Sequence, residues 1–223
     1  KRFTWGTSFS HLPYRGMYYT YYTDTASGYS FINYNLVRIF EENLATFSQY
    51  PLSSKLRIEG GLSYSRYSYR IDSINLFYQT KTKVDNVPDP FYVGSAYVAF
   101  VGDNSTFGIT SPLDGYRFRF QIGQMFDRYE ITNINIDLRK YFYYKPLSIA
   151  FRAMHYGRYG KSSEELYPVY LGNEYLIRGY NFSAFNKSME SEPDNYLDVN
   201  HLVGSKILVF NSEIRFPFSG VER

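Results

Sequence analysis

Hydrophobic and polar side chains alternate with a period of two along several segments of this chain. The alternation is most regular over residues 115–126, where one parity is apolar and the other is polar. The central run is Tyr116, Arg117, Phe118, Arg119, Phe120, Gln121, Ile122 and Gly123. Because successive residues of a β-strand point to opposite faces of a sheet, this pattern predicts a strand with one apolar and one polar face.

The same alternation predicts further strands. They cover residues 32–36, 56–64, 130–142, 147–154 and 205–216, while residues 3–10 and 92–101 look extended without choosing a face. Only two or three residues around Asp127 separate two of the clearest runs, which indicates a hairpin. No segment has a helical period that competes with these strands. We therefore expect an all-β fold.

The predicted strands are long, and their connections differ in length. The alternating runs last about ten residues or more, whereas strands of a soluble sandwich run about five or six. About ten residues is what a tilted strand needs to cross a bilayer. Short turns near Asp127 and at residues 144–146 contrast with long polar stretches at 71–90 and 158–203. We interpret these as short turns on one side and long loops on the other, which favours an outer-membrane β-barrel.

Composition fits a sheet with one apolar face. The chain has 26 Tyr and 19 Phe among 223 residues, yet its mean hydropathy of −0.39 is that of a polar sequence. No run approaches about eighteen apolar residues, which excludes a membrane-spanning helix. Tyr141, Tyr143 and Tyr144 cluster at one predicted strand end, as an aromatic girdle at a membrane interface requires. The alternative is that Tyr is simply a good strand former on an exposed face.

Charge and cysteine content narrow the function classes. The formal net charge is +3 and the basic residues are spread along the chain, so we expect no nucleic-acid partner. Without cysteine the chain has no disulfide, thiolate nucleophile or zinc–thiolate site. The three histidines lack ligand-like spacing, and we find no nucleophile motif or carboxylate pair. We expect no enzyme activity, no metal and no cofactor.

A segment rich in Tyr, Leu and Ile lies inside the longest loop, residues 158–203. Such a loop should fold back onto the protein rather than extend into solvent. Its Arg178 is followed by Gly179, which lets the backbone turn while the guanidinium reaches a carboxylate. The stretch from Gly172 to Tyr180, Gly-Asn-Glu-Tyr-Leu-Ile-Arg-Gly-Tyr, resembles the sixth-loop motif of the BamA–TamA superfamily of outer-membrane barrels, also called the bacterial surface antigen family.

The surrounding segments resemble this family in their order. Two strands joined by a short turn and a third strand precede the motif, and a strand that contains Asn211-Ser-Glu-Ile-Arg-Phe follows it. Asp103, with Pro112 and Gly115 after it, is similar to the family's approach to the preceding hairpin. Asn173 replaces the second glycine of the motif and still tolerates a left-handed turn.

The resemblance implies a transmembrane barrel of sixteen antiparallel strands. Residues 1–223 would all belong to this one barrel domain and supply about nine or ten strands, so we expect a fragment that lacks the closing strands. Loop 158–203 would be extracellular and would fold into the lumen. Its motif residues are Gly172, Ile177, Arg178, Gly179 and Tyr180.

In the family the motif arginine is implied to enter the lumen and pair with acidic residues. Glu213 is the candidate partner of Arg178, because it lies on the polar parity of its strand. Further charges are expected to face the lumen, namely Arg117, Arg119, Asp137, Arg139 and Arg152. They would form a charged pathway or a docking wall for the loop. The alternative is that a polar barrel interior needs such charges in any case.

The resemblance also implies a function, which is insertion, assembly or translocation of proteins at the cell outer membrane of a Gram-negative bacterium. The expected partners are outer-membrane lipid and lipopolysaccharide, unfolded barrel proteins and accessory lipoproteins. Residues 50–59 look similar to the branch of the family in which a TolB-like propeller precedes the barrel. The alternatives are a passive porin-like channel, a structural barrel subunit of a larger outer-membrane complex, and a soluble secreted β-sandwich used for binding.

Overall fold

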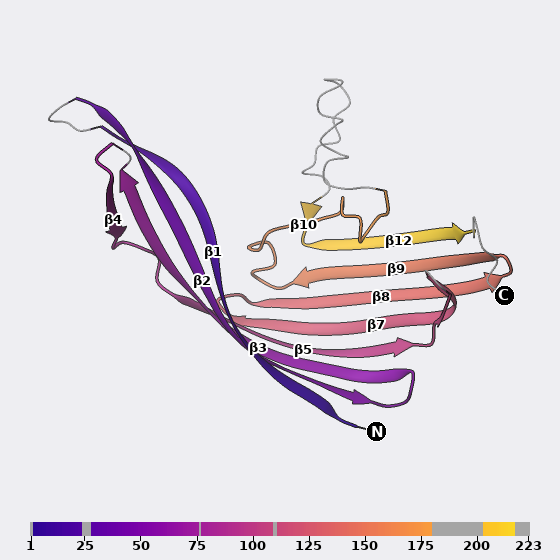
Figure 1. Ribbon diagram of the computed structural model, residues 1–223. Helices are drawn as coiled ribbons and strands as arrows, with labels where there is room; N and C mark the ends of the chain where they lie inside the picture. The colour runs from indigo at the N-terminus through magenta and orange to yellow at the C-terminus, as the bar shows by residue number, and fades with distance from the viewer. Residues whose placement is uncertain (1, 24–27, 76, 109–110, 180–202, 217–223) are drawn as a thin grey trace, which may run out of the picture. The chain divides into compact units, whose positions relative to one another are not determined.

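Every regular element in the described part of the chain is a β-strand (Figure 1). This computed structural model describes residues 2–23, 28–75, 77–108, 111–179 and 203–216. Within these ranges no helix is long and apolar enough to cross a membrane. The predicted all-β class is confirmed, together with a large antiparallel sheet.

Ten of the strands form one sheet. The strands are β1 (Thr4–Thr23), β2 (Ser30–Pro51), β3 (Leu56–Asn75), β4 (Thr80–Val84), β5 (Phe91–Asp103), β6 (Thr106–Phe107), β7 (Pro112–Asp127), β8 (Ile131–Tyr144), β9 (Leu147–Tyr159), β10 (Val169–Tyr170), β11 (Val203–Gly204) and β12 (Lys206–Arg215). The order in the sheet is β1-β2-β3-β5-β7-β8-β9-β12, with β4 paired to β3 and β6 to β7, while β10 pairs with β11. β1 and β12 end this order, and no pairing joins them among the described residues.

The chain divides into two compact units. Unit 1 comprises Lys1–Trp5, Phe47–Gly61 and Ala96–Arg223, and unit 2 comprises Gly6–Thr46 and Leu62–Ser95. Strands β7, β8, β9 and β12 lie wholly in unit 1, and β4 lies wholly in unit 2. The motif segment and every charge that the sequence predicts for the lumen therefore fall in unit 1.

Antiparallel ladders in unit 1 keep the two parities of each strand on separate faces. In the β7–β8 ladder Phe120 lies opposite Ile136 and Arg119 lies opposite Asp137. The β8–β9 and β9–β12 ladders continue the same alternation across two more strands. One face therefore collects Phe, Ile and Leu side chains, and the other collects Arg, Asp, Asn and Glu.

The apolar face of unit 1 is exposed, and the polar face is the more buried one. Phe210 is 73% exposed and Ile214 is 75% exposed, whereas Ser148 on the polar face is 3% exposed. A shallow groove of about 390 Å³ over β5, β7 and β8 is lined largely by apolar side chains such as Phe120 and Ile134. Water-soluble sheets bury their apolar parity, so unit 1 has the reverse arrangement.

The expected separation of short and long connections is wrong at one turn. In an antiparallel meander successive connections lie at opposite ends of the strands, so the β7–β8 turn at Asp127 and the β8–β9 turn at residues 145–146 cannot share a side. Because β9 runs back from the β8–β9 turn, the Asp127 turn lies at the same end as the segment that follows β9. Three residues thus connect two strands at the end where we expected only long loops.

The expected aromatic girdle does not include Tyr141. This residue is 4% exposed on the polar face, where the guanidinium carbon of Arg215 lies 5.7 Å from its ring centroid. Tyr141 shares the parity of Asp137 and Arg139, so its side chain must point to their face. Tyr144 has the opposite parity and remains exposed.

Residues 71–90 of unit 2 are not the polar loop that we expected. Strand β3 continues to Asn75 and pairs with β4, so that Asp72 lies opposite Lys83 and Ile74 opposite Lys81. The Thr-Lys-Thr-Lys-Val sequence of β4 has no apolar parity, which removes the usual signal for a strand. Pairing with β3 and the ion pair between Lys81 and Asp72 support it instead.

Candidate functional site

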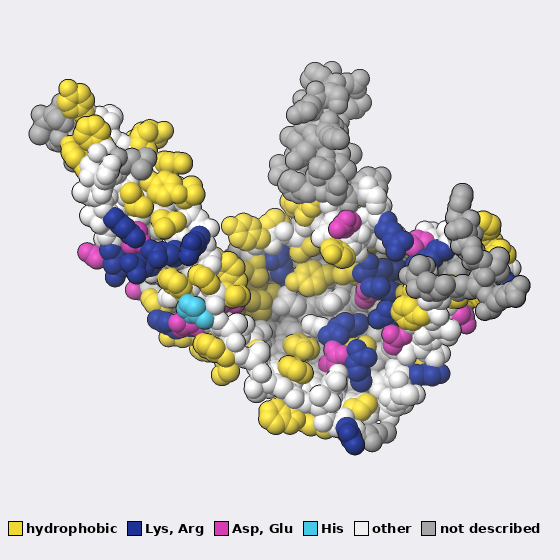
Figure 2. Space-filling model, viewed as in Figure 1, with side chains coloured by type: hydrophobic (Ala, Val, Ile, Leu, Met, Phe, Trp, Pro, Cys, Tyr) yellow, Lys and Arg dark blue, Asp and Glu magenta, His cyan; other side chains and the backbone are white. Residues whose placement is uncertain are grey.

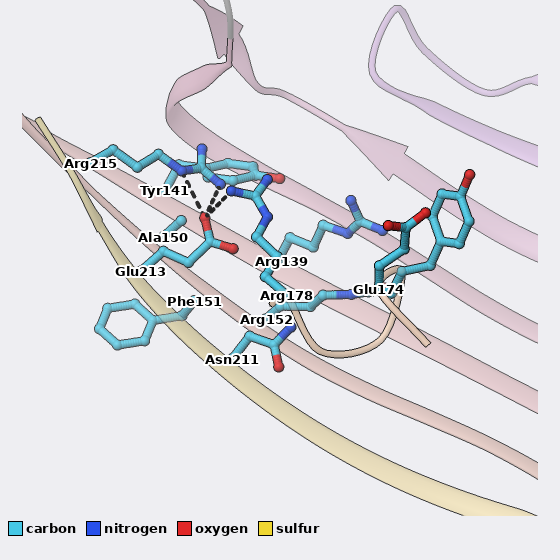
Figure 3. A pocket seen from close by; sticks show the side chains of 11 residues that line it. Arg139, Tyr141, Ala150, Phe151, Arg152, Glu174, Arg178, Asn211, Glu213 and Arg215 are labelled. Carbon is cyan, nitrogen blue, oxygen red and sulfur yellow. Dashed lines mark hydrogen bonds and ion pairs between the residues drawn. The ribbon is translucent and has the colours of Figure 1, made fainter. Parts of the chain in front are cut away.

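A cavity of about 300 Å³ lies on the polar face of unit 1, where the segment after β9 folds against β8, β9 and β12 (Figure 3). Four arginines and two glutamates converge on it. The lining residues are Arg139, Tyr141, Ala150, Phe151, Arg152, Glu174, Tyr175, Arg178, Asn211, Glu213 and Arg215. The cavity therefore brings together four of the residues singled out from the sequence, Arg139, Arg152, Arg178 and Glu213.

Asn173 shapes the turn that faces this cavity. Its carbonyl oxygen accepts hydrogen bonds from the amides of Leu176 and Ile177, both at 2.9 Å, and its Oδ1 accepts one from the amide of Tyr175 at 2.9 Å. The result is one tight turn capped by an Asx side chain. Asn173 has no positive φ, so the left-handed turn that asparagine tolerates is not adopted at this position. The side chain satisfies a backbone donor that glycine would leave free.

The two motif glycines meet different geometric demands. Gly179 has a φ of +85°, in the left-handed region that favours glycine. A Cβ on Gly172 would lie 2.5 Å from the ring of Tyr170, so a side chain there would displace that ring. Ile177 is half-buried and does not line the cavity. Tyr180, like residues 181–202 of the expected loop, lies outside the described residues.

Asp137 organises the arginines beside the turn. Arg139 donates to it from Nε and Nη2 at 3.0 and 2.7 Å, and Arg152 donates from Nε and Nη2 at 3.2 and 2.9 Å. Two guanidinium forks thus grip one carboxylate from neighbouring strands. This fixes both arginines and leaves Nη1 of Arg152 free for another acceptor.

That acceptor is the backbone of the turn. Nη1 of Arg152 donates to the carbonyl oxygen of Tyr175 at 2.7 Å, and Nδ2 of Asn211 donates to the carbonyl oxygen of Leu176 at 2.9 Å. The side chain of Leu176 is buried. Side chains from β9 and β12 therefore hold two successive carbonyls of the turn against the polar face.

Arg178 makes a more exposed contact at the same cavity. Its Nη1 lies 3.2 Å from Oε2 of Glu213, but its side chain is 76% exposed, against 25% for Glu213. Arg215 donates to the same Oε2 from Nε and Nη2 at 3.0 and 2.9 Å, and from Nη1 to the carbonyl oxygen of Pro112 at 3.1 Å. Glu213 is thus shared, and its firmer partner is Arg215, which lies two residues away on the same strand face.

The remaining predicted lumen charges form ion pairs beside the cavity. Arg117 Nε lies 2.9 Å from Oδ2 of Asp103, and Arg119 Nη1 lies 2.7 Å from Oε2 of Glu59. Arg57 Nε lies 2.6 Å from the other oxygen of Glu59. All three arginines line an adjacent cavity of about 230 Å³ on the polar face, and Figure 2 shows the charged side chains gathered there.

Arg158 is a site residue that the sequence analysis missed. It is 3% exposed near the end of β9, and its Nη2 donates to the carbonyl oxygen of Tyr167 at 2.9 Å. Its Nε has no partner among the described residues. We placed position 158 in the loop, although its parity matches that of Arg152. Because β9 continues to Tyr159, Arg158 lies on the polar face of the sheet. With Arg152 and Asn211, it is the third side chain of this face that donates to a backbone carbonyl of the segment after β9.

The hydrogen bonds of this site hold the segment after β9 against the polar face of the sheet. Its arginines and Asn211 aim donors at backbone carbonyls, and Asp137 and Glu213 keep the guanidinium groups in place. Within the described ranges, no three His, Asp or Glu side chains come together as a metal would require. Comparisons with family models, with curated proteins and with solved structures found no match.

Proposed function

We propose that this chain builds part of the wall of an outer-membrane β-barrel of the BamA–TamA superfamily. The proposed activity is insertion, assembly or translocation of proteins at the outer membrane of a Gram-negative cell. In this proposal the apolar face of unit 1 meets lipid, the polar face lines the lumen, and the segment after β9 is an extracellular loop that braces the wall from inside.

The exposed apolar face of unit 1 is the observation that carries the membrane part of this proposal. Its strands β7, β8 and β9 have 16, 14 and 13 residues, and a tilted strand crosses a bilayer in about nine to eleven. Side chains such as Phe210 and Ile214 would contribute roughly 1.5–3 kcal/mol each on leaving water for an apolar environment. A lipid phase supplies that environment without any further protein layer.

The turn on the polar face supports the superfamily assignment. Arg178 meets Glu213, Gly179 has the positive φ that favours glycine, and Gly172 lies close against the ring of Tyr170. A family member would insert clients where a poorly paired strand edge offers backbone donors and acceptors to an incoming strand. A loop fastened to the lumen wall would keep the rest of the sheet in register during that exchange.

The activity is tested by reconstituting the full-length protein into liposomes and following the folding of a small unfolded barrel protein. Liposomes that contain a porin of similar size are the control, because they share the lipid and the protein load. We expect faster client assembly than in either porin liposomes or empty liposomes. Equal rates in all three preparations would contradict an assembly function while leaving the barrel wall intact.

A passive channel is the second candidate, and the excess of arginine on the polar face favours it. Seven arginines take part in the ion pairs of that face, against four carboxylates. They are Arg57, Arg117, Arg119, Arg139, Arg152, Arg178 and Arg215, with Glu59, Asp103, Asp137 and Glu213. A channel with this wall would prefer anions. Large, steady, anion-selective conductance in planar bilayers, without client assembly, would favour the channel.

A further inference from the structure

The turn between β3 and β4 in unit 2 presents two aromatic side chains to solvent. Oδ1 of Asn75 accepts hydrogen bonds from the amides of Phe77 and Tyr78 at 3.0 and 2.9 Å, and Gln79 closes the turn with a φ of +51°. Phe77 is 73% exposed and Tyr78 is 57% exposed. The turn is held by its own hydrogen bonds, and both aromatic residues are mostly accessible to solvent.

The ring of Phe31 extends this pair into an aromatic tip, which we define as Phe31, Phe77 and Tyr78. The ring of Phe31, which is largely buried, packs against those of Phe77 and Tyr78 with centroid distances of 5.3 and 5.2 Å. Figure 2 shows hydrophobic side chains gathered at the end of unit 2 where β3 turns into β4. A clustered apolar surface of this kind marks an interaction site.

A cluster of cations lies on the strands next to the aromatic tip. Around the buried carboxylate of Asp72, Arg38 forms an ion pair, Nε of Arg70 lies at 3.3 Å and Nζ of Lys81 lies at 3.7 Å. Lys83 stands opposite Asp72 in the β3–β4 ladder. Three cations thus contact one carboxylate, Lys83 stands beside them in the ladder, and the side chains of Arg70 and Lys81 are about half exposed. The cluster has a net positive charge, which an anionic partner would complement.

The nearness of the rings to the cations suits a lipid surface. Lys81, in β4, follows Tyr78 of the turn by only three residues. Aromatic rings favour the boundary between acyl chains and headgroups, and Lys and Arg favour the phosphates just above it. One surface of anionic lipid would cover the rings and neutralise the cations at the same time. A neutral surface would leave the cations without a counter-charge.

We propose that the aromatic tip and the adjacent cation cluster of unit 2 form a docking site for a membrane surface that carries phosphate-bearing anionic lipids. The rings enter the headgroup boundary, while Lys81, Lys83 and Arg70 meet lipid phosphates. This goes beyond the proposed assembly function and does not rest on it, because the site lies wholly in unit 2 and needs no client protein.

The test uses the full chain held in nanodiscs of phosphatidylcholine and measures its capture of free lipid vesicles. We expect capture of vesicles that contain phosphatidylglycerol, weak capture of pure phosphatidylcholine vesicles, and a decline with rising salt. The double variant Lys81→Gln/Lys83→Gln should bind roughly tenfold or more weakly. The double variant Phe77→Ser/Tyr78→Ser should also bind weakly but keep the salt dependence of its residual binding.

The matched control is Lys161→Gln/Tyr167→Ser, which removes an exposed lysine and an exposed tyrosine from unit 1 and should bind like the parent. Circular dichroism of every variant establishes that its sheet is formed. Equal capture of both vesicle types, or unchanged capture by the lysine variant, overturns the proposal. Self-association of the protein that the aromatic variant abolishes, without vesicle capture, would assign the tip to a second copy instead. Neither outcome bears on client assembly.

Discussion

Two arginines beside the loop differ in how firmly they hold it. Arg152 has an 18% exposed side chain, grips both oxygens of Asp137 and donates to the carbonyl of Tyr175. Arg178 is the motif residue, yet it is mostly exposed and shares its carboxylate with Arg215. Partly buried charged hydrogen bonds contribute more to stability than exposed ion pairs do. We therefore expect Arg152 to hold the loop more firmly than Arg178 does.

Replacing each arginine by alanine tests this ranking. Arg152→Ala should lower the free energy of unfolding by about 1.5–3 kcal/mol, because it removes charged hydrogen bonds to both the wall and the loop. Arg178→Ala should lower it by about 0–1 kcal/mol. Urea unfolding of the micelle-held protein measures both values, and hydrogen exchange at residues 173–177 reports on the loop. A larger loss for Arg178→Ala would show that the motif arginine is the main anchor.

At the scale of elements, period-two alternation in the sequence predicts the strands of unit 1 and the two faces of their sheet. Parity is a local property, so it places Arg119 and Asp137 on one face without any tertiary information. The sequence pattern does not predict β4, because this strand is stabilised by its pairing with β3 and by the ion pair between Lys81 and Asp72. The sequence motif does not predict the conformation of the turn at Asn173, because this conformation depends on a hydrogen bond from the amide of Tyr175 to the Asn173 side chain.

The side-chain cap of the loop turn can be tested at Asn173. Asn173→Ala should lower the free energy of unfolding by about 1 kcal/mol, because the amide of Tyr175 loses its hydrogen-bond acceptor. Asn173→Asp keeps an acceptor oxygen at the same place and should retain most of the stability. The difference is measured as protection of the Tyr175 amide in hydrogen exchange. If both variants expose this amide equally, the Asn173 side chain does not hold the turn.

At the scale of the whole molecule the central claim is that the apolar face of unit 1 lies against lipid. Leu138, Phe210 and Ile214 are exposed on that face, while the opposite face carries a network of arginines and carboxylates. In water such a face would promote aggregation, and in a bilayer it would contribute most of the stability of the wall. The consequence of a charge on this face therefore depends on what surrounds it.

The most direct measurement compares Phe210→Arg with Tyr167→Arg in the protein reconstituted in bilayers. Both residues are exposed aromatics, at 73% and 95%, but Phe210 is on the apolar face and Tyr167 is in the segment after β9. A lipid-facing arginine costs about 2–4 kcal/mol near the bilayer midplane, whereas a substitution at a water-exposed surface stays within about 0.5 kcal/mol. We predict a loss of folding free energy of about 2–4 kcal/mol for Phe210→Arg and little change for Tyr167→Arg. Changes below about 0.5 kcal/mol for both variants would contradict the account and place the apolar face in water.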